Sequence, residues 1–451
     1  MSEKITRRDW IRILSASGLA VGLGAFRTLD EAIADEGGAS NKLIKVVTQG
    51  DHPAALLTGG KVIQPQRELP VLRKTDVLVV GGGPAGVSAA IAARRAGADV
   101  TLVERYGYFG GQWTGGYVLV VMAILGKDKT QVTRGIGEEM LQRLDKMDLA
   151  IINRKPGVLP TVDAEALKYI MVEMVREAGI VVFLHCWGVD AVMEGNTVRG
   201  AVFESKSGRQ AILADVVVDA TGDGDVFAAA GAEYEHRKYH IGLVCRLGNV
   251  DTVDPALRKQ DKKRRNLGSS TPMPGINWVN MQGPDADALD VAELTRLEMD
   301  HRRQIWKTVR ELRKTPGYEK VYLVDIAPQL GVRISRLLAG TGKLTLEGAK
   351  AQKTYPDVIG YGGICYDLKS EWQIPYGALV PVKVENILAA GRCISTDPKM
   401  VEPMRVIAPC FVTGHAAGAA AALAVKDKCR PRDVEIGRLQ KLLKEQGAYL
   451  G

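Results

Sequence analysis

Three glycines have the spacing that brings a polypeptide backbone close to a phosphate. Gly81, Gly83 and Gly86 form the pattern G-x-G-x-x-G directly after an apolar run. In such a turn the first glycine permits a sharp bend, the second lets the backbone approach a pyrophosphate, and the third lets the next helix pack on the strand. The helix N-terminus then offers free N–H groups to the phosphates. The pattern predicts a dinucleotide site that includes Pro84 and Ala85.

An acidic residue downstream narrows the choice of dinucleotide. Glu104 follows a second apolar run, at the distance from the glycines at which a carboxylate binds a ribose 2′-hydroxyl. The same carboxylate would repel a 2′-phosphate, so the position favours FAD or NAD over NADP. A glycine-rich turn alone is weak evidence for such a site. Because this turn lies between two apolar runs and Glu104 follows the second, a dinucleotide site is better supported than a glycine-rich turn that occurs by chance.

The elements that must position these residues follow from the apolar pattern. Asp76 to Val80 is almost continuously apolar, as in a strand buried on both faces. With a helix from Val87 to Ala96 and a strand from Asp99 to Val103, it predicts a βαβ unit. Further expected elements are a helix over 163–178 capped by Asp163, hairpin turns at 194–196 and 206–208, a strand over 215–220, and helices over 289–313 and 412–425.

Several separated segments resemble one family. They include DVLVVGGGPAG, LVERYGYFGGQWTGG, DATGDGDVFAAAGAEYE, APQLGVRISR, IPYGALVP, NILAAGRCIS and MRVIAPCFVTGHAAG. Together the chain resembles the FAD-dependent oxidoreductases of the glutathione-reductase type, in their succinate dehydrogenase and fumarate reductase-like branch. More closely, it is similar to a bacterial family known only as FAD-dependent oxidoreductases. The resemblance implies FAD as cofactor and an α/β fold, with a doubly wound (Rossmann-like) FAD-binding domain and an inserted α+β cap or substrate domain.

The resemblance and the changes in composition together predict five regions. They are a signal peptide over 1–34, an extended lead-in over 35–70, the first part of the FAD-binding domain over 71–235, the cap or substrate domain over 236–379, and the C-terminal part of the FAD-binding domain over 380–451.

The resemblance also implies further cofactor contacts. Relatives often have an acidic residue where this chain has Arg392, so a contact of Arg392 with the ribityl chain of FAD is in doubt. The segment from Arg405 to Thr413 would direct the last helix at the pyrimidine edge of the flavin, where a positive dipole end stabilises the anionic reduced form. The implied contacts are Arg105, Gly110, Gly111, Gln112, Thr114, Ala220, Thr221, Gly222, Gly391, Arg392 and Thr413.

Arginines are the first candidates for the chemistry, because fumarate-reducing relatives use arginine near the flavin. Arg405 lies in the flavin-facing segment, where catalysis and structural anchoring are equally supported. Arg333 and Arg336 are three residues apart and could share a helical face. For this pair, a structural ion pair is at least as well supported as substrate contact.

Other polar side chains are weaker candidates. Tyr361 stands in GYGGICYDL with Cys365, Tyr366 and Asp367, a stretch that the resemblance places near the substrate cavity. His240 could face the flavin, although an exposed histidine is the simpler interpretation. For His415, Cys393 and Cys410, packing is the better-supported role.

The N-terminus has the features of an export signal. Arg7 and Arg8 precede a short apolar run from Ile13 to Phe26, and Ala32-Ile33-Ala34 offers a small-residue cleavage site. The run is too short and too diluted to span a bilayer stably. We expect the twin-arginine translocase to carry the folded protein to the periplasm or outside the cell. The alternative is an amphipathic helix with two chance arginines.

Composition excludes other classes of protein. The net charge of +8 has a basic cluster at Arg258–Arg265 without interleaved aromatics, which indicates a solvated face and not a nucleic-acid site. The six cysteines lack CxxC spacing, so we expect neither a redox disulfide nor a metal site. The missing CxxC, and the lack of a second G-x-G-x-x-G after the first domain, exclude a pyridine-nucleotide disulfide reductase.

We therefore expect an FAD-dependent dehydrogenase or reductase of a small organic substrate. Because an exported enzyme lacks a pool of reduced nicotinamide, its electron partner should be a quinone, a cytochrome or oxygen. A non-enzymatic flavin carrier or assembly flavoprotein is the alternative, and a flavin monooxygenase is less well supported. A cap that encloses a cavity against the flavin would favour an enzyme.

Overall fold

A computed structural model of the chain describes residues 54–153, 159–260 and 266–451. It contains two compact units, residues 1–68 and 69–451, and each is described here by itself. The predicted signal peptide, and with it Arg7 and Arg8, lies outside the described residues. So do residues 35–53 of the lead-in and most of the basic cluster at 258–265.

The described part of the first unit contains a short hairpin, within the region that the sequence predicted as an extended lead-in. Strand β1 (Leu56–Thr58) pairs antiparallel with β2 (Lys61–Ile63). Gly59 and Gly60 form the turn at φ of +57° and +74°, the backbone conformation that a two-residue hairpin requires. The sequence predicted only an extended lead-in over 35–70, and these two strands were missed.

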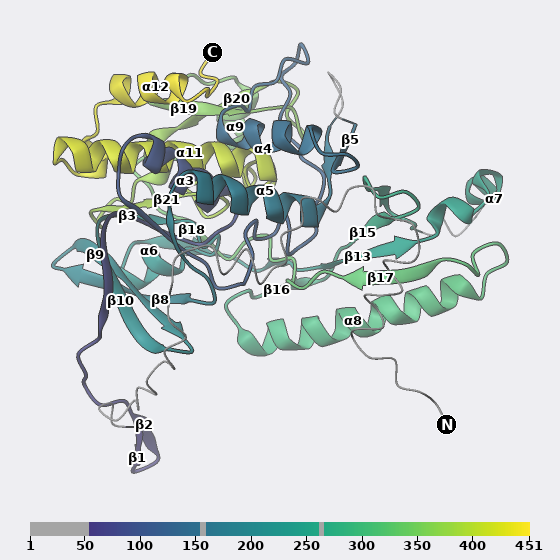
Figure 1. Cartoon of the computed structure of the whole chain (residues 1–451), viewed down its shortest axis with the longest axis horizontal. Coiled ribbons are helices and arrows are strands. Elements are labelled where there is room, and N and C mark those ends of the chain that lie inside the picture. The colour runs from purple at the N-terminus through teal and green to yellow at the C-terminus, as the bar shows by residue number, and fades with distance from the viewer. Residues whose placement is uncertain (1–53, 154–158, 261–265) are drawn as a thin grey trace, which may run out of the picture. The chain divides into compact units, whose positions relative to one another are not determined.

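The central sheet of the second unit is built on parallel strands in the order β7-β4-β3-β10 (Figure 1). These are β7 (Val181–Phe183), β4 (Val100–Val103), β3 (Val71–Val80) and β10 (Gly208–Asp219). Val77, Leu78 and Val79 are fully buried, as the continuous apolar run predicted. A mixed α/β fold with a parallel, Rossmann-like sheet is thereby confirmed.

Strand β10 changes partners along its length. Its first half pairs antiparallel with β9 (Thr197–Ser205), which pairs with β8 (Trp187–Glu194). Its last three residues pair in parallel with β21 (Ile387–Ala389), a strand from the C-terminal part of the chain. The sheet is therefore completed by a segment that follows β10 by more than 160 residues.

Helices α3 (Pro84–Arg95), α4 (Ile136–Asp145), α5 (Ala164–Glu177) and α11 (Ile407–Asp427) lie together beside the parallel strands (Figure 1). Helix α11 packs on α3 at very short range. A Cβ at Gly414 would stand 2.0 Å from the carbonyl oxygen of Ala85, and one at Gly418 would stand 2.0 Å from that of Ala89. Among the described residues, only α11 is long and apolar enough to cross a bilayer, and its apolar stretch is wholly buried in the fold.

A second, antiparallel sheet has the order β14-β15-β13-β17. Its strands are β14 (Ser269–Ser270), β15 (Asn277–Met281), β13 (Leu243–Gly248) and β17 (Tyr322–Ile326). The long helix α8 (Val291–Arg313) lies along this sheet, and α7 (Pro255–Gln260) lies at the same end of the molecule (Figure 1). The whole of 69–451 forms one compact unit, so the boundaries predicted for an inserted domain at 236 and 379 stay a prediction.

The remaining elements are short or lie at the C-terminus. They are β5 (Ile151–Ile152), β6 (Thr161–Val162), α6 (Asp225–Ala229), β11 (Tyr234–His236), β12 (Tyr239–His240), β16 (Asp285–Ala286), β18 (Arg336–Leu338), α9 (Leu346–Lys350), β19 (Val358–Gly362), β20 (Trp372–Pro375), α10 (Val401–Met404) and α12 (Ile436–Glu445).

Most expected elements are present with shifted ends. Asp163 caps α5 by accepting hydrogen bonds from the backbone N–H groups of Glu165 and Ala166, as predicted. The strand expected at 76–80 begins at Val71 because its first residues also pair with β10. The helical face expected to carry Arg333 and Arg336 is wrong, since Arg336 opens strand β18 and Arg333 lies in the loop before it.

Candidate cofactor and active site

A large cavity opens where the parallel strands end. Its lining includes the residues that follow β3, β4, β10 and β21, namely Gly81, Glu104, Ala220 and Ala390. Its empty volume, including the open mouth, is about 1420 Å³. Ligands of open α/β sheets bind at the carboxyl ends of the strands, so the fold places this cavity where the glycine pattern predicted a dinucleotide.

The three patterned glycines have distinct surroundings. Gly81 has a φ of +103°, and a Cβ there would stand 2.4 Å from the carbonyl oxygen of Ala220. A Cβ at Gly86 would stand 1.7 Å from the carbonyl oxygen of Gly81, so helix and strand pack too closely for any side chain. Around Gly83 nothing lies within 4 Å of a built Cβ. Gly83 is thus the glycine at which the backbone borders open space, and Pro84 and Ala85 line the cavity next to it.

Glu104 is buried and held by the backbone. Its Oε2 accepts a hydrogen bond of 2.6 Å from the N–H of Gly82, and its Oε1 accepts one of 2.8 Å from the N–H of Tyr106. Burial raises the pKa of the carboxyl group above its ordinary value, although both hydrogen bonds act to lower it. Arg105 also lines the cavity, and its guanidinium lies 4.7 Å from the centre of the Tyr106 ring.

The loop after Glu104 turns back to the glycines. The N–H of Gly110 donates to the carbonyl oxygen of Gly82, and Gly110 has a φ of +106°. Gly111 and Gln112 line the cavity. Gly110 and Thr114 do not line it. Thr114 is fully buried and donates to the carbonyl oxygen of Phe109, so its part is to shape the loop.

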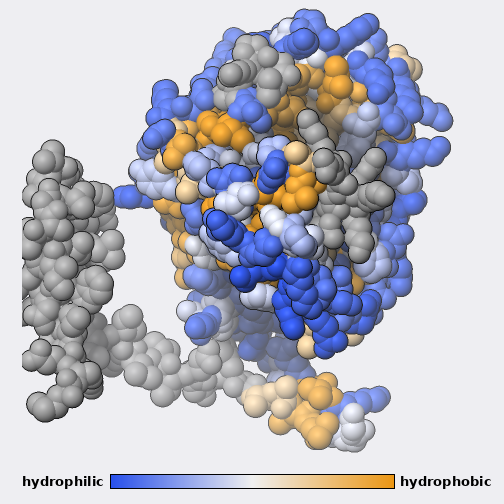
Figure 2. All heavy atoms as spheres, turned by 90° about the vertical axis from the view of Figure 1, so that its right-hand side faces the viewer, coloured by the Kyte–Doolittle hydropathy of each residue, from blue (hydrophilic) through white to orange (hydrophobic). Residues whose placement is uncertain are grey.

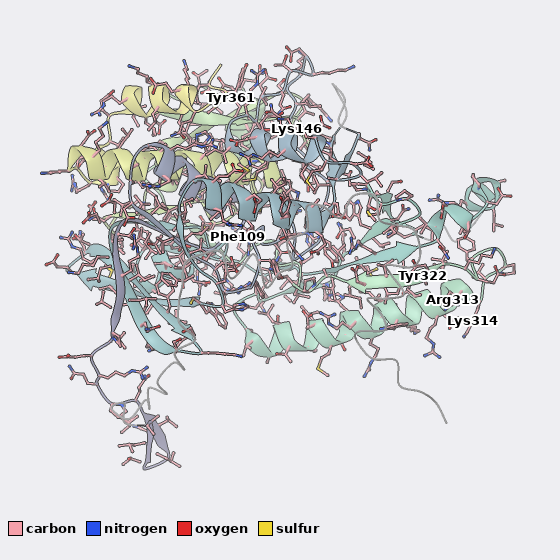
Figure 3. The ribbon with its side chains drawn as sticks, viewed as in Figure 1. Phe109, Lys146, Arg313, Lys314, Tyr322 and Tyr361 are labelled. Atoms are coloured by element: carbon pink, nitrogen blue, oxygen red, sulfur yellow. The ribbon has the colours of Figure 1, made fainter. Side chains whose placement is uncertain are left out.

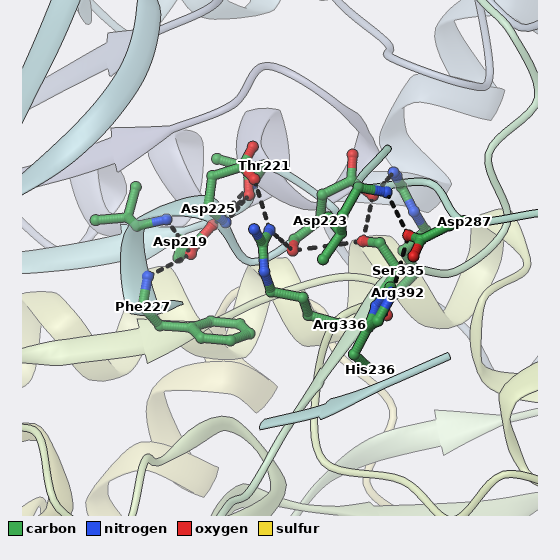
Figure 4. A network of polar contacts seen from close by, with 12 residues as sticks. Asp219, Thr221, Asp223, Asp225, Phe227, His236, Asp287, Ser335, Arg336 and Arg392 are labelled. Carbon is green, nitrogen blue, oxygen red and sulfur yellow. Dashed lines mark hydrogen bonds and ion pairs between the residues drawn. The ribbon is translucent and has the colours of Figure 1, made fainter. Parts of the chain in front are cut away.

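The TGDGD segment after β10 forms a buried network of acids and arginines, shown in Figure 4. Asp219 accepts hydrogen bonds from the N–H groups of Val226 and Phe227 at the start of α6. Asp223 pairs with Arg392 at 2.8 Å and accepts a hydrogen bond from Ser335. Burial acts to raise the pKa of Asp223, but the Arg392 cation and these hydrogen bonds bring it below its ordinary value overall.

This ion pair accounts for the arginine that departs from the relatives. Arg392 lines the cavity beside Ala220, Thr221 and Gly222, and its charge is balanced by Asp223. Gly222 lies directly against it, since a Cβ there would be 2.0 Å from Nη1 of Arg392. Arg336 pairs with Asp225 at 2.8 Å and does not line the cavity.

Thr413 supports the cavity from behind. Its hydroxyl oxygen accepts a hydrogen bond of 3.0 Å from the N–H of Gly391, which lines the cavity, while Thr413 itself is fully buried and does not line it.

Four buried polar atoms on the lining have no partner among the described residues: Oε1 of Gln112, Nε1 of Trp278, Nε of Arg392 and Nε of Arg405. Because buried polar atoms are normally paired, these atoms indicate that a polar ligand belongs there. With the open space at Gly83, the unpaired atoms of Gln112 and Arg392 fit a bound FAD.

Another part of the lining carries charged side chains. Arg333 and Arg405 both line the cavity, as does Tyr366. Arg405 is paired with Glu402, and its Nη2 lies 3.3 Å from the hydroxyl of Tyr366. Arg333 donates to the carbonyl oxygen of His240 at 3.0 Å. We call the set Tyr239, His240, Arg333, Tyr366, Glu402 and Arg405 the arginine cluster, and the cavity-lining residues of 81–85, 104–105 and 220–222 the glycine cradle.

Glu402 connects this cluster. It accepts a hydrogen bond from the hydroxyl of Tyr239 as well as from Arg405. Burial acts to raise its pKa, but Arg405 and the hydrogen bonds hold the pKa below its ordinary value overall, so the group is a carboxylate. Burial lowers the pKa of Arg333, and the nearby Arg405 lowers it further, because two cations face one region.

The other two catalytic candidates lie elsewhere. His240 does not line the cavity, but its ring stacks on Tyr239 at 4.2 Å between centres, and its Nε2 lies 3.8 Å from Oε1 of Glu402. Burial lowers its pKa, and Arg333 lowers it further. Tyr361 also does not line the cavity. Its hydroxyl accepts a hydrogen bond from Gln373 and its ring contacts Tyr449, beside α12 and away from Phe109 (Figure 3). The position expected for Tyr361 is therefore corrected.

Sequence reasoning singled out neither Glu402 nor Asp223. Glu402 stands three residues before Arg405, which is the only local signal that it would balance that arginine. Asp223 was quoted within TGDGD, but nothing local joins it to Arg392, 169 residues away. Among the described residues, no group of histidine, cysteine, aspartate and glutamate side chains is arranged to hold a metal ion, and the six cysteines are unpaired.

Comparison with known proteins gives a family match over most of the chain. A sequence model of the family described as FAD dependent oxidoreductase matches residues 76–443. Thiamine thiazole synthase of Aeropyrum pernix is 33% identical over 172 residues, which are 36% of this chain and 59% of that protein. The match thus spans less than two thirds of that relative's length.

Solved structures of similar fold are more distant. A geranylgeranyl bacteriochlorophyll reductase-like protein from Thermoplasma acidophilum is 17% identical, with 83% of each chain covered and a TM-score of 0.45. The open conformation of a flavocytochrome c3 fumarate reductase is 16% identical, with 79% of each chain covered and a TM-score of 0.40. We draw no conclusion about function from likenesses at this level.

Proposed function

The chain belongs to the family of FAD-dependent oxidoreductases, enzymes that use FAD, and we propose that it is a dehydrogenase or reductase of a small organic substrate with a non-nicotinamide electron partner. One observation carries the proposal. A single cavity is lined both by the glycine cradle, which suits a dinucleotide, and by Arg333, Tyr366 and Arg405 of the arginine cluster, which exceed what holding a dinucleotide requires.

The glycine cradle would hold FAD. We assign the pyrophosphate to the N-terminus of α3 at Gly83, the ribose hydroxyls to Glu104, and further contacts to Gln112, Thr221 and Arg392. When bound, FAD supplies the transfer of a hydride to or from the substrate.

The arginine cluster would orient the substrate. Arg333 and Arg405 present two guanidinium groups to the cavity, and Glu402 balances one of them. The remaining positive charge favours an oxygen-rich or anionic group of the substrate. Tyr239, hydrogen-bonded to Glu402, and Tyr366, beside Arg405, are the hydroxyl groups of the cluster that can hold a proton. Their role in proton transfer is inferred from their positions in the cluster and from these hydrogen bonds.

Export belongs to the same proposal. The paired arginines at 7 and 8 support passage of the folded protein through the twin-arginine translocase to the periplasm or beyond. A quinone, a cytochrome or oxygen would then exchange electrons with the enzyme. Fractionation of cells that make the chain, compared with cells that make an Arg7→Lys, Arg8→Lys variant, tests this part. If both proteins are distributed equally among the cell fractions, the proposal of export through the twin-arginine translocase is refuted.

Substrate screening tests the reaction. The purified protein should be yellow, and anaerobic addition of candidate substrates should bleach the flavin absorbance if one of them is oxidised. If instead the enzyme is a reductase, the chemically reduced protein should regain its colour with an acceptor substrate. The alternative, a flavin electron carrier, predicts exchange with redox dyes and proteins but no response to any small organic molecule.

A substitution in the arginine cluster distinguishes an enzyme from a flavin electron carrier. In an enzyme, Arg405→Lys should leave flavin content unchanged and slow bleaching by substrate by about a hundredfold. In a carrier, the same variant should exchange electrons with dyes as fast as the parent. A colourless, folded preparation that takes up no added FAD would refute the assignment of the cavity itself.

A further inference from the structure

Helix α8 has an outward face that no other described element covers. Its inward residues Leu297, His301 and Ile305 are buried. On the outside Val291, Met299 and Trp306 are 77%, 66% and 55% exposed. Met299 and Trp306 are seven residues, or two helical turns, apart, and Val291 lies eight residues before Met299. The exposed side chains of Met299 and Trp306 therefore share one face of the helix, and Val291 is exposed at its first residue.

Cationic side chains gather around this face in the C-terminal half of α8. Residues 301–315 hold six lysines and arginines against one acidic residue, Glu311. Arg303 and Arg310 stand three residues before and four residues after Trp306, and therefore flank it on the helix surface. Neither they nor Lys307 form an ion pair with any described residue, whereas Lys314 pairs with Glu311. With six cations and one acid, residues 301–315 carry a net charge of +5, the same as the basic cluster at 258–265.

The helix dipole alone does not account for the cluster. A helix C-terminus favours cations only within its last turn, which covers Arg310 and Arg313. Arg303 and Lys307 lie further inside the helix, where the dipole gives them no such preference. Figure 3 shows Tyr322, which is 43% exposed, at the same end of the molecule as Arg313 and Lys314. Figure 2 views this end of the molecule and shows hydrophilic side chains gathered over the lower part of the face.

We propose that this outward face of α8 docks on an anionic phospholipid surface. A helix that lies in a membrane interface combines lysine and arginine with exposed apolar and aromatic side chains, and tryptophan favours the level of the headgroups. The charge of this face identifies the surface that it binds, since cations without ion-pair partners beside an exposed tryptophan are complementary to a negatively charged bilayer. The charged residues throughout α8 exclude a transmembrane helix, so the contact is peripheral.

The orientation follows from the distribution of charge along α8. The acidic side chains Glu293, Glu298 and Asp300 lie in its first half, so the second half would approach the lipid. The face also lies away from the cavity, because Val244 of β13 lines the cavity while its neighbour Cys245 faces α8. Docking would thus leave the cavity unobstructed, and its test needs no knowledge of the substrate.

Sedimentation with lipid vesicles tests the proposal. The full chain should bind vesicles that contain phosphatidylglycerol and should bind phosphatidylcholine vesicles at least tenfold more weakly, with binding lost as salt rises. The variant Arg303→Glu, Lys307→Glu, Arg310→Glu should lower the partition coefficient at least tenfold, since each cation near such a surface contributes about fivefold. Trp306→Gln should lower it by a few fold.

A matched control distinguishes the effect of this face of α8 from the effect of the protein's overall positive charge. The variant Lys146→Glu, Lys206→Glu, Lys444→Glu reverses three exposed lysines on other elements and should bind within twofold of the parent. The N-terminal residues are identical in all variants, so they cannot produce the difference. Equal binding by the α8 variant and the parent would overturn the proposal. So would absence of vesicle binding together with a dimer that the α8 substitutions break.

Discussion

The glycine cradle and the arginine cluster differ in the kinds of residues that form them. The glycine cradle consists largely of backbone and small side chains that come from strand ends, and its shape depends on close packing at Gly81 and Gly86. The arginine cluster consists of long polar and charged side chains contributed by four separated segments of the chain, and Arg333, Tyr366 and Arg405 among them line the cavity. Substitutions in the cradle should therefore act on folding and flavin retention, and substitutions in the cluster should act on the rate of the reaction.

The largest expected effect contrasts Gly83, which lines the cradle, with Gly86, which packs against Gly81 behind it. Gly86→Val should lower the free energy of unfolding by more than about 4 kcal/mol, because its side chain would overlap the carbonyl group of Gly81. Gly83→Val should change stability by less than about 1 kcal/mol, since a Cβ there meets nothing, yet it should abolish flavin binding. Urea unfolding and the flavin absorbance of both variants check this contrast. Equal destabilisation by the two would contradict it.

The buried ion pair beside the cradle comes next. Asp223→Asn leaves the Arg392 cation buried without its counterion, and should lower the free energy of unfolding by about 3 kcal/mol. Ser335→Ala removes one hydrogen bond to the same carboxylate and should lower it by about 1 kcal/mol. Both values come from the urea midpoint. A stable Asp223→Asn protein would show that Arg392 has another anion to pair with.

The arginine cluster should show the opposite behaviour. Glu402→Gln removes the charge that balances Arg405, and should slow anaerobic flavin reduction by substrate about a hundredfold, or about 3 kcal/mol in activation free energy, with flavin content and stability near those of the parent. Tyr361→Phe serves as the control and should react within twofold of the parent, because Tyr361 is paired with Gln373 outside the cavity. A slow Tyr361→Phe enzyme would restore Tyr361 as a candidate.

The smallest expected effect concerns the support of the cradle by α11. His415 is buried against Gln446, and burial lowers its pKa to about 4. The unfolded chain, with an ordinary histidine pKa near 6.5, binds more protons between these values, so stability is present above pH 6.5 and declines as the pH falls. Between pH 7 and pH 5 the loss should be about 2 kcal/mol. His415→Gln should remove this part of the pH dependence in urea unfolding, and an unchanged slope would contradict the assignment.

The same contrast explains what the sequence could predict. The cradle depends on local spacing, so Gly81, Gly83 and Glu104, with Gly86 packed behind them, were identified as neighbours from the order of residues alone. The arginine cluster depends on contacts such as that of Tyr239 with Glu402, 163 residues apart, for which no local pattern exists. Arg405 and Arg333 were found because the resemblance implied arginine near the flavin, while their partner Glu402 was not.

Errors at the level of the fold have a similar origin. Arg333 and Arg336 have helical spacing, but pairing of β18 with β11 takes Arg336 into a strand, and only the tertiary fold decides this. Tyr361 lies in a glycine-rich stretch expected near the cavity. Tyr366 of that stretch does line the cavity, but strand β19 takes Tyr361 toward the C-terminus. The hairpin at 56–63 was missed because its strands are only three residues long.

The late partner of strand β10 has a consequence for biosynthesis. Strand β21 and helix α11 stand near the end of the chain, yet β21 completes the parallel sheet and α11 packs directly on the helix that follows the glycines. A ribosome must therefore release nearly the whole polypeptide before the cofactor pocket can close, and nascent chains that stop before Ile387 should emerge colourless. Cofactor loading must therefore follow synthesis of the C-terminal part of the chain.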